Sequence, residues 1–339
     1  MNSKKKILLA MGVLLPIFVY VLVKYFTLPN NVSTLNTAVE LTIPRGTSLK
    51  TFADSLEKKG LVRSASYFVF WAKKYGLERK LPSGKFRIPG SLNTVQLVKY
   101  LLRARPEFVS VTLIEGWSTE KIFQKLSTAL KLNIRVLDSL GRDSSFLASF
   151  GIPIADVTGY LLPDTYVFAY GISEKQIVRF LIRKTLAVFE PDSIRQRMKV
   201  LGLNRHQILT LASIVEGEAL LDRERPIIAS VYLNRLKRGM RLQADPTIQF
   251  LIKDGPRRLR YRDLKIQSPY NTYLHAGLPP GPINNPGKKS IMAVLFAAKT
   301  KYLYFVAKGD GSHFFARTAA EHAKAKQKLN RLRRKIYGY

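Results

Sequence analysis

The sequence contains no cysteine, two tryptophans and four histidines among 339 residues. Without cysteine the chain has no disulfide framework, no thiol nucleophile and no cysteine-based zinc site. The histidines are scattered and form no HExxH pair, so the sequence predicts no metal site. No motif nominates a Schiff-base lysine or another cofactor site, and we expect the protein to need no cofactor.

Acidic residues are scarce as well: 23 Asp and Glu stand against 56 Lys and Arg, which gives a formal net charge of +33. Such an excess favours an acidic partner (nucleic acid, anionic lipid or a polyanionic wall polymer) or solubility in an acidic cell wall. The basic residues are spread along the whole chain, and no recognisable nucleic-acid motif is present, so we expect no nucleic-acid partner. The length of 339 residues is enough for two or three domains, and a hydrophobic content of 46% is ordinary for a globular protein and does not indicate disorder.

The N-terminal part carries a long apolar run from Ile7 to Phe26, preceded by three lysines. The run is long enough to cross a bilayer, and the lysines place the N-terminus in the cytoplasm. A retained anchor is favoured over a cleaved signal peptide, because the end of the run has no small-residue cleavage site. We therefore predict a single-pass protein of the inner (cytoplasmic) membrane with its bulk on the extracytoplasmic side. Its first segments are a cytoplasmic N-terminus at 1–6, a transmembrane helix at 7–26 and a linker at 27–37.

Two similar stretches follow, VELTIPRGTSLKTFADSLEKKGLV from Val39 and VSVTLIEGWSTEKIFQKLSTAL from Val109. Each is typical of a strand, a glycine-containing turn, an N-cap and an amphipathic helix, which indicates related βα units. The predicted fold class is α+β, with one module at 38–105, a connecting βα region at 106–158 and a further domain at 159–339. Aromatic residues at helical spacing are expected in the core of the first module: Tyr67, Phe68, Phe70, Trp71 and Tyr75.

Two glutamates end an apolar helical run in the second half of the chain. Residues 208–215 are predominantly apolar, and Glu216 and Glu218 follow on different faces of the expected helix. A carboxyl group at the margin of an apolar stripe has a raised pKa, which suits a general acid near neutral pH. The alternative is a pair of solvated surface glutamates, and periodicity alone does not choose between the two.

Polar residues in two irregular segments are candidates for contacts with a ligand. The segment GMRLQADPT contains Gln243, Asp245 and Thr247, although this sequence also fits a plain capped turn. The Pro- and Gly-rich segment 268–287 contains Tyr270, Asn271 and Tyr273, and the polar groups of such an irregular segment can face a ligand. The four arginines of the segment 254–267 could meet peptide carboxylates or form a solvated loop.

The C-terminal part is expected to form a helix at 287–300, a hairpin and a basic helix at 318–339. The hairpin has strands at 302–306 and 313–316, and its return strand begins with His313. This histidine is either a packed core residue or a residue of the site.

Five sequence motifs occur in order over the last half of the chain: SIVEGEA, IASVYLNRL, GMRLQADPT, SPYNTYLHAGLPPGPINNPG and AAKTKYLYFVAKGDGSHFFA. Together they resemble the endolytic murein transglycosylases, the MltG or YceG-like family. The resemblance implies a YceG-like mixed α+β catalytic domain at 159–339 and a LysM-like module at 38–105. It further implies a lyase that cleaves the β-1,4 bond between N-acetylmuramic acid and N-acetylglucosamine within nascent glycan strands and leaves 1,6-anhydro ends.

The resemblance also assigns roles to residues. Glu216 corresponds to the family's single general acid/base, and Glu218 is expected to support the site electrostatically. The expected substrate-binding residues are Gln243, Asp245, Thr247, Tyr270, Asn271, Tyr273 and His313. The implied partners are peptidoglycan glycan strands and peptidoglycan synthases. Two rival functions stay open: a membrane-anchored, non-catalytic glycan-binding or scaffold protein, and a basic nucleic-acid-binding protein with strongly salt-dependent affinity.

Overall fold

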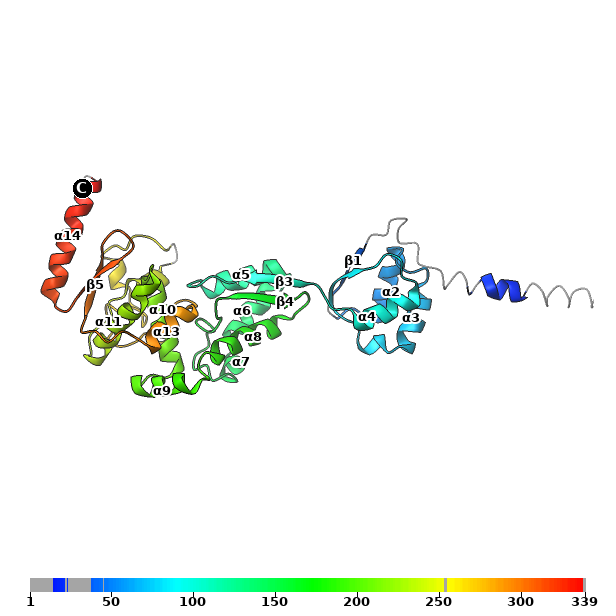
Figure 1. Cartoon of the computed structure of the whole chain (residues 1–339), viewed down its shortest axis with the longest axis horizontal. Helices are drawn as coiled ribbons and strands as arrows, with labels where there is room; N and C mark the ends of the chain where they lie inside the picture. The colour runs from blue at the N-terminus through cyan, green and yellow to red at the C-terminus, as the bar shows by residue number, and fades with distance from the viewer. Residues whose placement is uncertain (1–14, 22, 24–37, 45, 253–254, 338–339) are drawn as a thin grey trace, which may run out of the picture. The chain divides into compact units, whose positions relative to one another are not determined.

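The computed structural model describes residues 15–21, 23, 38–44, 46–252 and 255–337 (Figure 1). Most of the predicted transmembrane run at 7–26 lies outside these residues, as do the predicted N-terminus at 1–6 and linker at 27–37. Within the described part of the chain, none of the helices combines the length and the apolar character that a membrane crossing needs. The anchor therefore stays a prediction.

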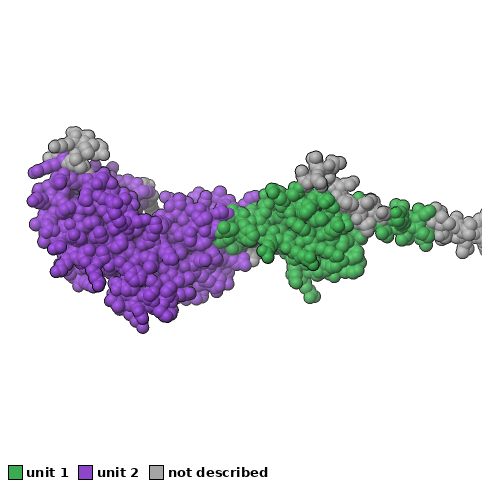
Figure 2. Space-filling view, in the orientation of Figure 1, with its two compact units in different colours: residues 1–109, 167–172 green, residues 110–166, 173–339 purple. Residues whose placement is uncertain are grey.

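The chain divides into two compact units (Figure 2). The first comprises residues 1–109 and 167–172, and the second comprises residues 110–166 and 173–339. The module predicted at 38–105 falls inside the first unit. The expected boundary between residues 158 and 159 falls inside the second unit, so the structure does not separate the connecting region from the predicted catalytic domain at that point.

The first unit packs helices against a two-stranded antiparallel sheet. Strand β1 (Val39–Ile43) pairs with β2 (Gly84–Ile88) so that Val39 faces Ile88 and Ile43 faces Gly84. The helices are α2 (Leu49–Lys58), α3 (Ala65–Lys74), the short 3-10 helix η1 (Leu77–Arg79) and α4 (Thr94–Arg103). Their core is apolar and includes Leu41, Phe52, Leu56, Phe68 and Phe86. This arrangement is α+β, as the sequence predicts.

The aromatic residues of α3 divide between core and surface. Phe68 is fully buried, as expected, but Phe70 and Tyr75 are 59% and 38% exposed. The prediction that they lie in the core is wrong, because the helix buries only one face and these two side chains fall outside it.

The two similar stretches adopt the same local structure, which confirms that prediction. Gly46 and Gly116 have φ angles of 76° and 75°, a left-handed turn that favours glycine. Ser48 then caps α2 by accepting a hydrogen bond from the Thr51 amide, and Ser118 caps the helix that follows it by accepting one from the Lys121 amide.

The first part of the second unit consists mainly of helices. Strand β3 (Phe108–Thr112) pairs with β4 (Thr165–Ala169), and residues of this pair belong to both units. The helices are α5 (Thr119–Leu130), α6 (Ile134–Arg142), α7 (Ser144–Ala148), α8 (Glu174–Ala187) and α9 (Asp192–Leu201).

The second part of this unit is built around a buried helix, α10 (Arg205–Glu218), which packs against α11, α12 and α13 (Figure 1). The elements after α10 are η2 (Asp222–Glu224), α11 (Arg225–Lys237), α12 (Asp245–Leu251), η3 (Asp263–Lys265), α13 (Lys288–Leu295), β5 (Tyr304–Ala307), β6 (His313–Ala316) and α14 (Ala319–Tyr337). The predicted C-terminal hairpin is confirmed, with Tyr304 paired to Ala316 and Ala307 paired to His313.

The fully buried Asn285 joins the two parts of the second unit. Its Oδ1 accepts hydrogen bonds from the amides of Gly159 and Leu161 at 2.9 and 3.2 Å. Its backbone amide and its Nδ2 both donate to the carbonyl of Trp117, at 3.0 and 3.1 Å. One side chain therefore satisfies backbone groups from segments far apart in the sequence, which explains why residues 158 and 159 lie within one compact unit.

Candidate active site

Helix α10 carries the two glutamates at its C-terminal end. A capping box formed by Asn204 and Gln207 starts the helix. Every residue from Ile208 to Val215 is buried, which is typical of a helix in the middle of a core. Because the helix ends at Glu218, its last turn brings both carboxylates to the edge of this core.

Glu216 is held on both of its carboxylate oxygens. Oε1 accepts a hydrogen bond from Nη1 of Arg225 at 2.9 Å, and Oε2 accepts one from the amide of Gly287 at 3.0 Å. The Glu216 and Arg225 side chains are only 6% and 8% exposed. Two N–H groups that donate to two oxygens are the arrangement that an ionised carboxylate accepts.

Arg225 connects Glu216 to a wider polar network. Its Nε donates to Oδ1 of Asp222 at 3.0 Å, and its Nη1 also donates to Oγ of Ser290 at 2.5 Å. Lys289 forms a further ion pair with Asp222 at 2.6 Å. The network joins the end of α10 to η2, α11 and the start of α13, so it fixes Glu216 in place.

Glu218 lies in different surroundings. The side chain is half-buried, and its Oε1 accepts a hydrogen bond from the hydroxyl of Tyr232 at 2.7 Å. Burial raises the pKa of Glu218 to about 7; the Tyr232 hydrogen bond opposes this rise and the negative charge of Asp245 adds to it. Tyr232 is fully buried, and burial raises its own pKa well above the ordinary value, so it remains a donor. Glu218 can therefore exchange a proton near neutral pH.

Two of the predicted sugar-contacting residues are exposed, and one of them, Asp245, lies near Glu218. Asp245, the first residue of α12, is exposed and accepts a hydrogen bond from the hydroxyl of Tyr273 at 2.5 Å. Gln243 is also exposed, and its backbone has a φ of 47°, which is uncommon for a residue other than glycine. Its amide donates to the carbonyl of Thr272 at 3.0 Å, which keeps this turn against the Tyr273 segment. Leu220, two residues beyond Glu218, is 76% exposed.

Two other predicted contacts, Thr247 and Asn271, are fully buried and support the backbone instead. The Thr247 hydroxyl bonds the carbonyl of Ala244 at 2.7 Å and the hydroxyl of Thr272 at 2.9 Å. The Asn271 amide donates to the carbonyls of Leu264 and Ile266, and its oxygen accepts from the amide of Tyr273. The structure does not place either side chain where it can contact a ligand, because both are already used inside the protein.

Among the described residues, the last two predicted contacts form no hydrogen bond with Glu216 or Glu218. Tyr270 is half-buried, with its ring 4.9 Å from that of Phe250. His313 pairs through Nδ1 with Oε2 of Glu224 at 2.7 Å, and its backbone amide donates to the other oxygen of Glu224. His313 therefore fastens β6 to η2, and its ring meets Phe305, which in turn packs edge-on against Tyr232.

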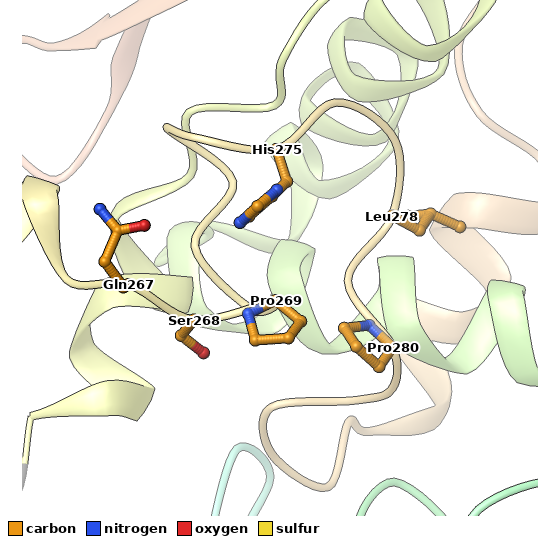
Figure 3. A pocket seen from close by; sticks show the side chains of 6 residues that line it. All are labelled: Gln267, Ser268, Pro269, His275, Leu278 and Pro280. Atoms are coloured by element: carbon orange, nitrogen blue, oxygen red, sulfur yellow. The ribbon is translucent and has the colours of Figure 1, made fainter.

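A pocket of about 490 Å³ lies in the irregular segment after η3 (Figure 3). Its lining residues are Gln267, Ser268, Pro269, His275, Leu278 and Pro280. Neither Glu216 nor Glu218 lines this pocket, so it is not where the carboxylate chemistry lies.

The sequence-based reasoning missed Tyr232, Arg225 and Asn285. Tyr232 and Asn285 belong to sequence motifs that resemble the family. Nothing in their spacing, however, shows that Tyr232 contacts Glu218 or that Asn285 contacts the turn at Gly159. Arg225 stands in the charged stretch DRER, which is also typical of a solvated surface. Among the residues that the structure describes, no three His, Asp or Glu side chains gather as a metal site would require.

The chain is similar to known proteins over most of its length. The YceG-like family model matches residues 41–328. An endolytic murein transglycosylase of Bacillus subtilis (strain 168) is 32% identical over 308 residues, covering 86% of this chain and 85% of that protein. An endolytic murein transglycosylase of Streptococcus pneumoniae serotype 2 (strain D39 / NCTC 7466) is 29% identical, covering 84% of this chain and 57% of that protein. The crystal structure of a yceG-like protein from Listeria monocytogenes matches with a TM-score of 0.58 and 31% identity, covering 86% of this chain and 99% of the other.

Proposed function

This chain belongs to the YceG-like family, and we propose that it is a lytic transglycosylase that cleaves peptidoglycan strands endolytically. The observation that carries the proposal is the position of Glu218 at the end of α10, where its Oε1 accepts a hydrogen bond from the neutral hydroxyl of Tyr232 at 2.7 Å. Burial raises the pKa of this carboxyl to about 7, which suits a group that gives and takes a proton near neutral pH. The substrate class, peptidoglycan, is inferred from the names of the relatives, and the proton transfer is assigned to the carboxyl group of Glu218.

Glu218 is the general acid/base of this proposal, whereas the sequence resemblance assigns that role to Glu216 and a supporting role to Glu218, an assignment that stays a prediction. The physical reason is the difference between their partners. Glu216 is already held on both of its oxygens, by the guanidinium of Arg225 and by the amide of Gly287. Burial and the like charge of Asp245 raise the pKa of Glu218 and make its protonated form accessible, whereas the hydrogen bond from Tyr232 and the charge of Arg235 oppose that rise.

The reaction needs only one such group. The protonated Glu218 gives its proton to the oxygen that links N-acetylmuramic acid to N-acetylglucosamine, and the bond from that oxygen to C1 of the muramic residue breaks. The resulting carboxylate removes the proton from the C6 hydroxyl of the same muramic residue, whose oxygen bonds to C1. The products are a 1,6-anhydro end and a new N-acetylglucosamine end, no water is consumed, and Glu218 is again protonated.

The other side chains have supporting roles. Glu216, held by Arg225 and Gly287, keeps the last turn of α10 in position, and its charge stays compensated. The exposed Asp245 and Gln243 and the hydroxyl of Tyr273 offer polar groups to the sugars beside Glu218. Burial and the hydrogen bond to Asp245 raise the pKa of Tyr273, so this tyrosine stays a neutral donor.

The anchor and the surroundings are further parts of the proposal. Residues 7–26 would hold the chain in the cytoplasmic membrane, with the catalytic part on the extracytoplasmic side where peptidoglycan is made. The LysM-like character of residues 38–105 and a partnership with peptidoglycan synthases rest on the resemblance. Release of the full chain from membranes by detergent, and not by an alkaline wash, is the result expected for a spanning anchor.

The second candidate function is a non-catalytic glycan-binding or scaffold protein. Mass spectrometry of purified peptidoglycan after incubation with the protein separates the two. Anhydro-muramic ends, which are lighter than hydrolytic ends by one water, are expected for the transglycosylase. Ordinary reducing ends would mean a hydrolase, and binding without new ends would mean a scaffold.

A further inference from the structure

A hollow of about 340 Å³ lies in the second unit, apart from both glutamates. It is lined by residues from the start of α5, the end of α6 and the loop before β4, together with Phe250 of α12 and Ile283. Its volume is within the range of small-ligand sites.

Charged groups of both signs line this hollow. They are the guanidinium of Arg142 and the carboxylates of Glu120 and Asp156. Arg142 and Glu120 are exposed, and none of the three takes part in a salt bridge among the residues that the structure describes. One oxygen of Asp156 accepts the Thr158 amide at 2.8 Å, which fixes the loop and leaves the other oxygen available. A ligand that fits these groups carries both a carboxylate and an ammonium group.

The hollow also has an aromatic wall near the proposed chemistry. Phe250 is 42% exposed and packs against Tyr270. It stands five residues after Asp245 on α12, which is about 7–8 Å along the helix axis. Since Asp245 lies beside Glu218, the hollow is within reach of a group attached to a sugar that is bound near Glu218.

We propose that this hollow binds the stem peptide of the glycan strand, an inference that rests on the proposed function. The stem is a short peptide with free carboxylates and, on its diamino residue, a free amine, whereas N-acetylated sugars carry no ammonium group. Arg142 takes a carboxylate of the stem, Glu120 and Asp156 take the amine, and Phe250 packs on the aliphatic part. A uniformly acidic polymer would be repelled by the two carboxylates.

The cleavage test compares strands that keep their stem peptides with strands from which an amidase has removed them. We expect the wild-type kcat/KM to be higher on the peptide-bearing strands. Arg142→Ala should lower the ratio of the two kcat/KM values about tenfold, since a charge-assisted hydrogen bond is lost. The matched control is Arg179→Ala, an exposed arginine of α8 that does not line the hollow. An unchanged ratio in Arg142→Ala would overturn the proposal.

A binding test is independent of catalysis. Calorimetry with a free muramyl pentapeptide should give about tenfold weaker binding for Arg142→Ala than for the wild type and for Arg179→Ala. Acetylating the amine of the peptide should weaken its binding to the wild type. The double variant Glu120→Gln/Asp156→Asn should bind the free and the acetylated peptide with the same, reduced affinity. Equal affinities in all variants would refute the site. Cleavage of neither strand, with peptide binding that still depends on Arg142, would refute the proposed function and leave the site standing.

Discussion

The hydroxyl of Tyr232 donates a hydrogen bond to Oε1 of Glu218 over 2.7 Å, and this bond joins the middle of α11 to the end of α10. It distinguishes the two glutamates, because Glu218 receives a neutral donor in a buried setting while Glu216 receives a guanidinium. The bond favours the ionised form of Glu218, and burial together with the charge of Asp245 favours the protonated form.

Tyr232→Phe should move the alkaline limb of the activity profile to higher pH. The substitution keeps the buried ring and removes the donor that lowers the pKa of Glu218, so the acid stays protonated to higher pH. The pH dependence of kcat/KM measures the shift. Tyr166→Phe is the control, because it removes a hydroxyl that bonds the carbonyl of Leu162 instead. An unshifted limb would show that the bond does not act on the titrating group.

Asp245→Asn should move the same limb in the opposite direction. The negative charge of Asp245 raises the pKa of Glu218, so its removal lets Glu218 ionise at lower pH. Asp192→Asn is the matched control, since Asp192 forms an exposed ion pair with Arg195 far along the chain. A limb that moves upward in Asp245→Asn would contradict the proposed arrangement of charges around Glu218.

Glu218→Gln should remove a pH dependence of stability. A carboxyl whose pKa rises from 4.5 to about 7 on folding binds its proton more tightly in the folded state. Its stabilising effect is therefore present below pH 4.5 and is lost as the pH rises to about 7, by roughly 3 kcal/mol at most. Urea unfolding at pH 5 and pH 8 should show that the free energy of unfolding decreases less with rising pH in the variant than in the wild type. An equal decrease would mean that Glu218 does not titrate in this range.

Arg225→Gln should destabilise the protein strongly. It leaves the buried Glu216 carboxylate with the Gly287 amide and without its cation, a loss of about 3–5 kcal/mol. Arg195→Gln breaks an exposed pair and should cost less than about 1 kcal/mol. Denaturant unfolding of the two variants measures the difference. Similar losses in both would show that the Glu216–Arg225 pair does not hold the end of α10.

Local structure could be predicted well from the sequence, because short-range rules determine it. An N-cap was expected between each turn glycine and the amphipathic helix after it, and Ser48 and Ser118 form these caps. The C-terminal hairpin was predicted within two residues of its observed ends. Both glutamates fall at the end of α10, where the apolar run ends.

The surroundings of the two glutamates could not be predicted in the same way. Their partners are Tyr232, Arg225, Asp245 and Gly287, which stand between nine and 71 residues from the glutamate that each one affects. Helical spacing shows that the carboxylates face different sides, but only tertiary packing shows that one side offers a guanidinium and the other a tyrosine.

Thr247 and Asn271 show a second limit of sequence reasoning. Polar side chains in irregular segments can hydrogen-bond to the backbone as well as to a ligand, because turns leave backbone amides and carbonyls without partners in secondary structure. Both side chains are fully buried and used in this way, whereas the nearby Gln243 and Asp245 are exposed. All four side chains are polar, so only their burial in the folded protein distinguishes Thr247 and Asn271 from Gln243 and Asp245.

The most direct test of the central claim compares Glu218→Gln with Glu216→Gln by mass spectrometry of digested peptidoglycan, with thermal unfolding to show that each variant is folded. The account predicts that anhydro-muramic ends fall by about 10²–10⁴-fold in Glu218→Gln, which keeps a stable fold. It predicts that Glu216→Gln loses stability but still forms anhydro ends at a reduced rate. Anhydro ends that persist in Glu218→Gln and vanish in a folded Glu216→Gln would contradict the account and return the acid/base role to Glu216.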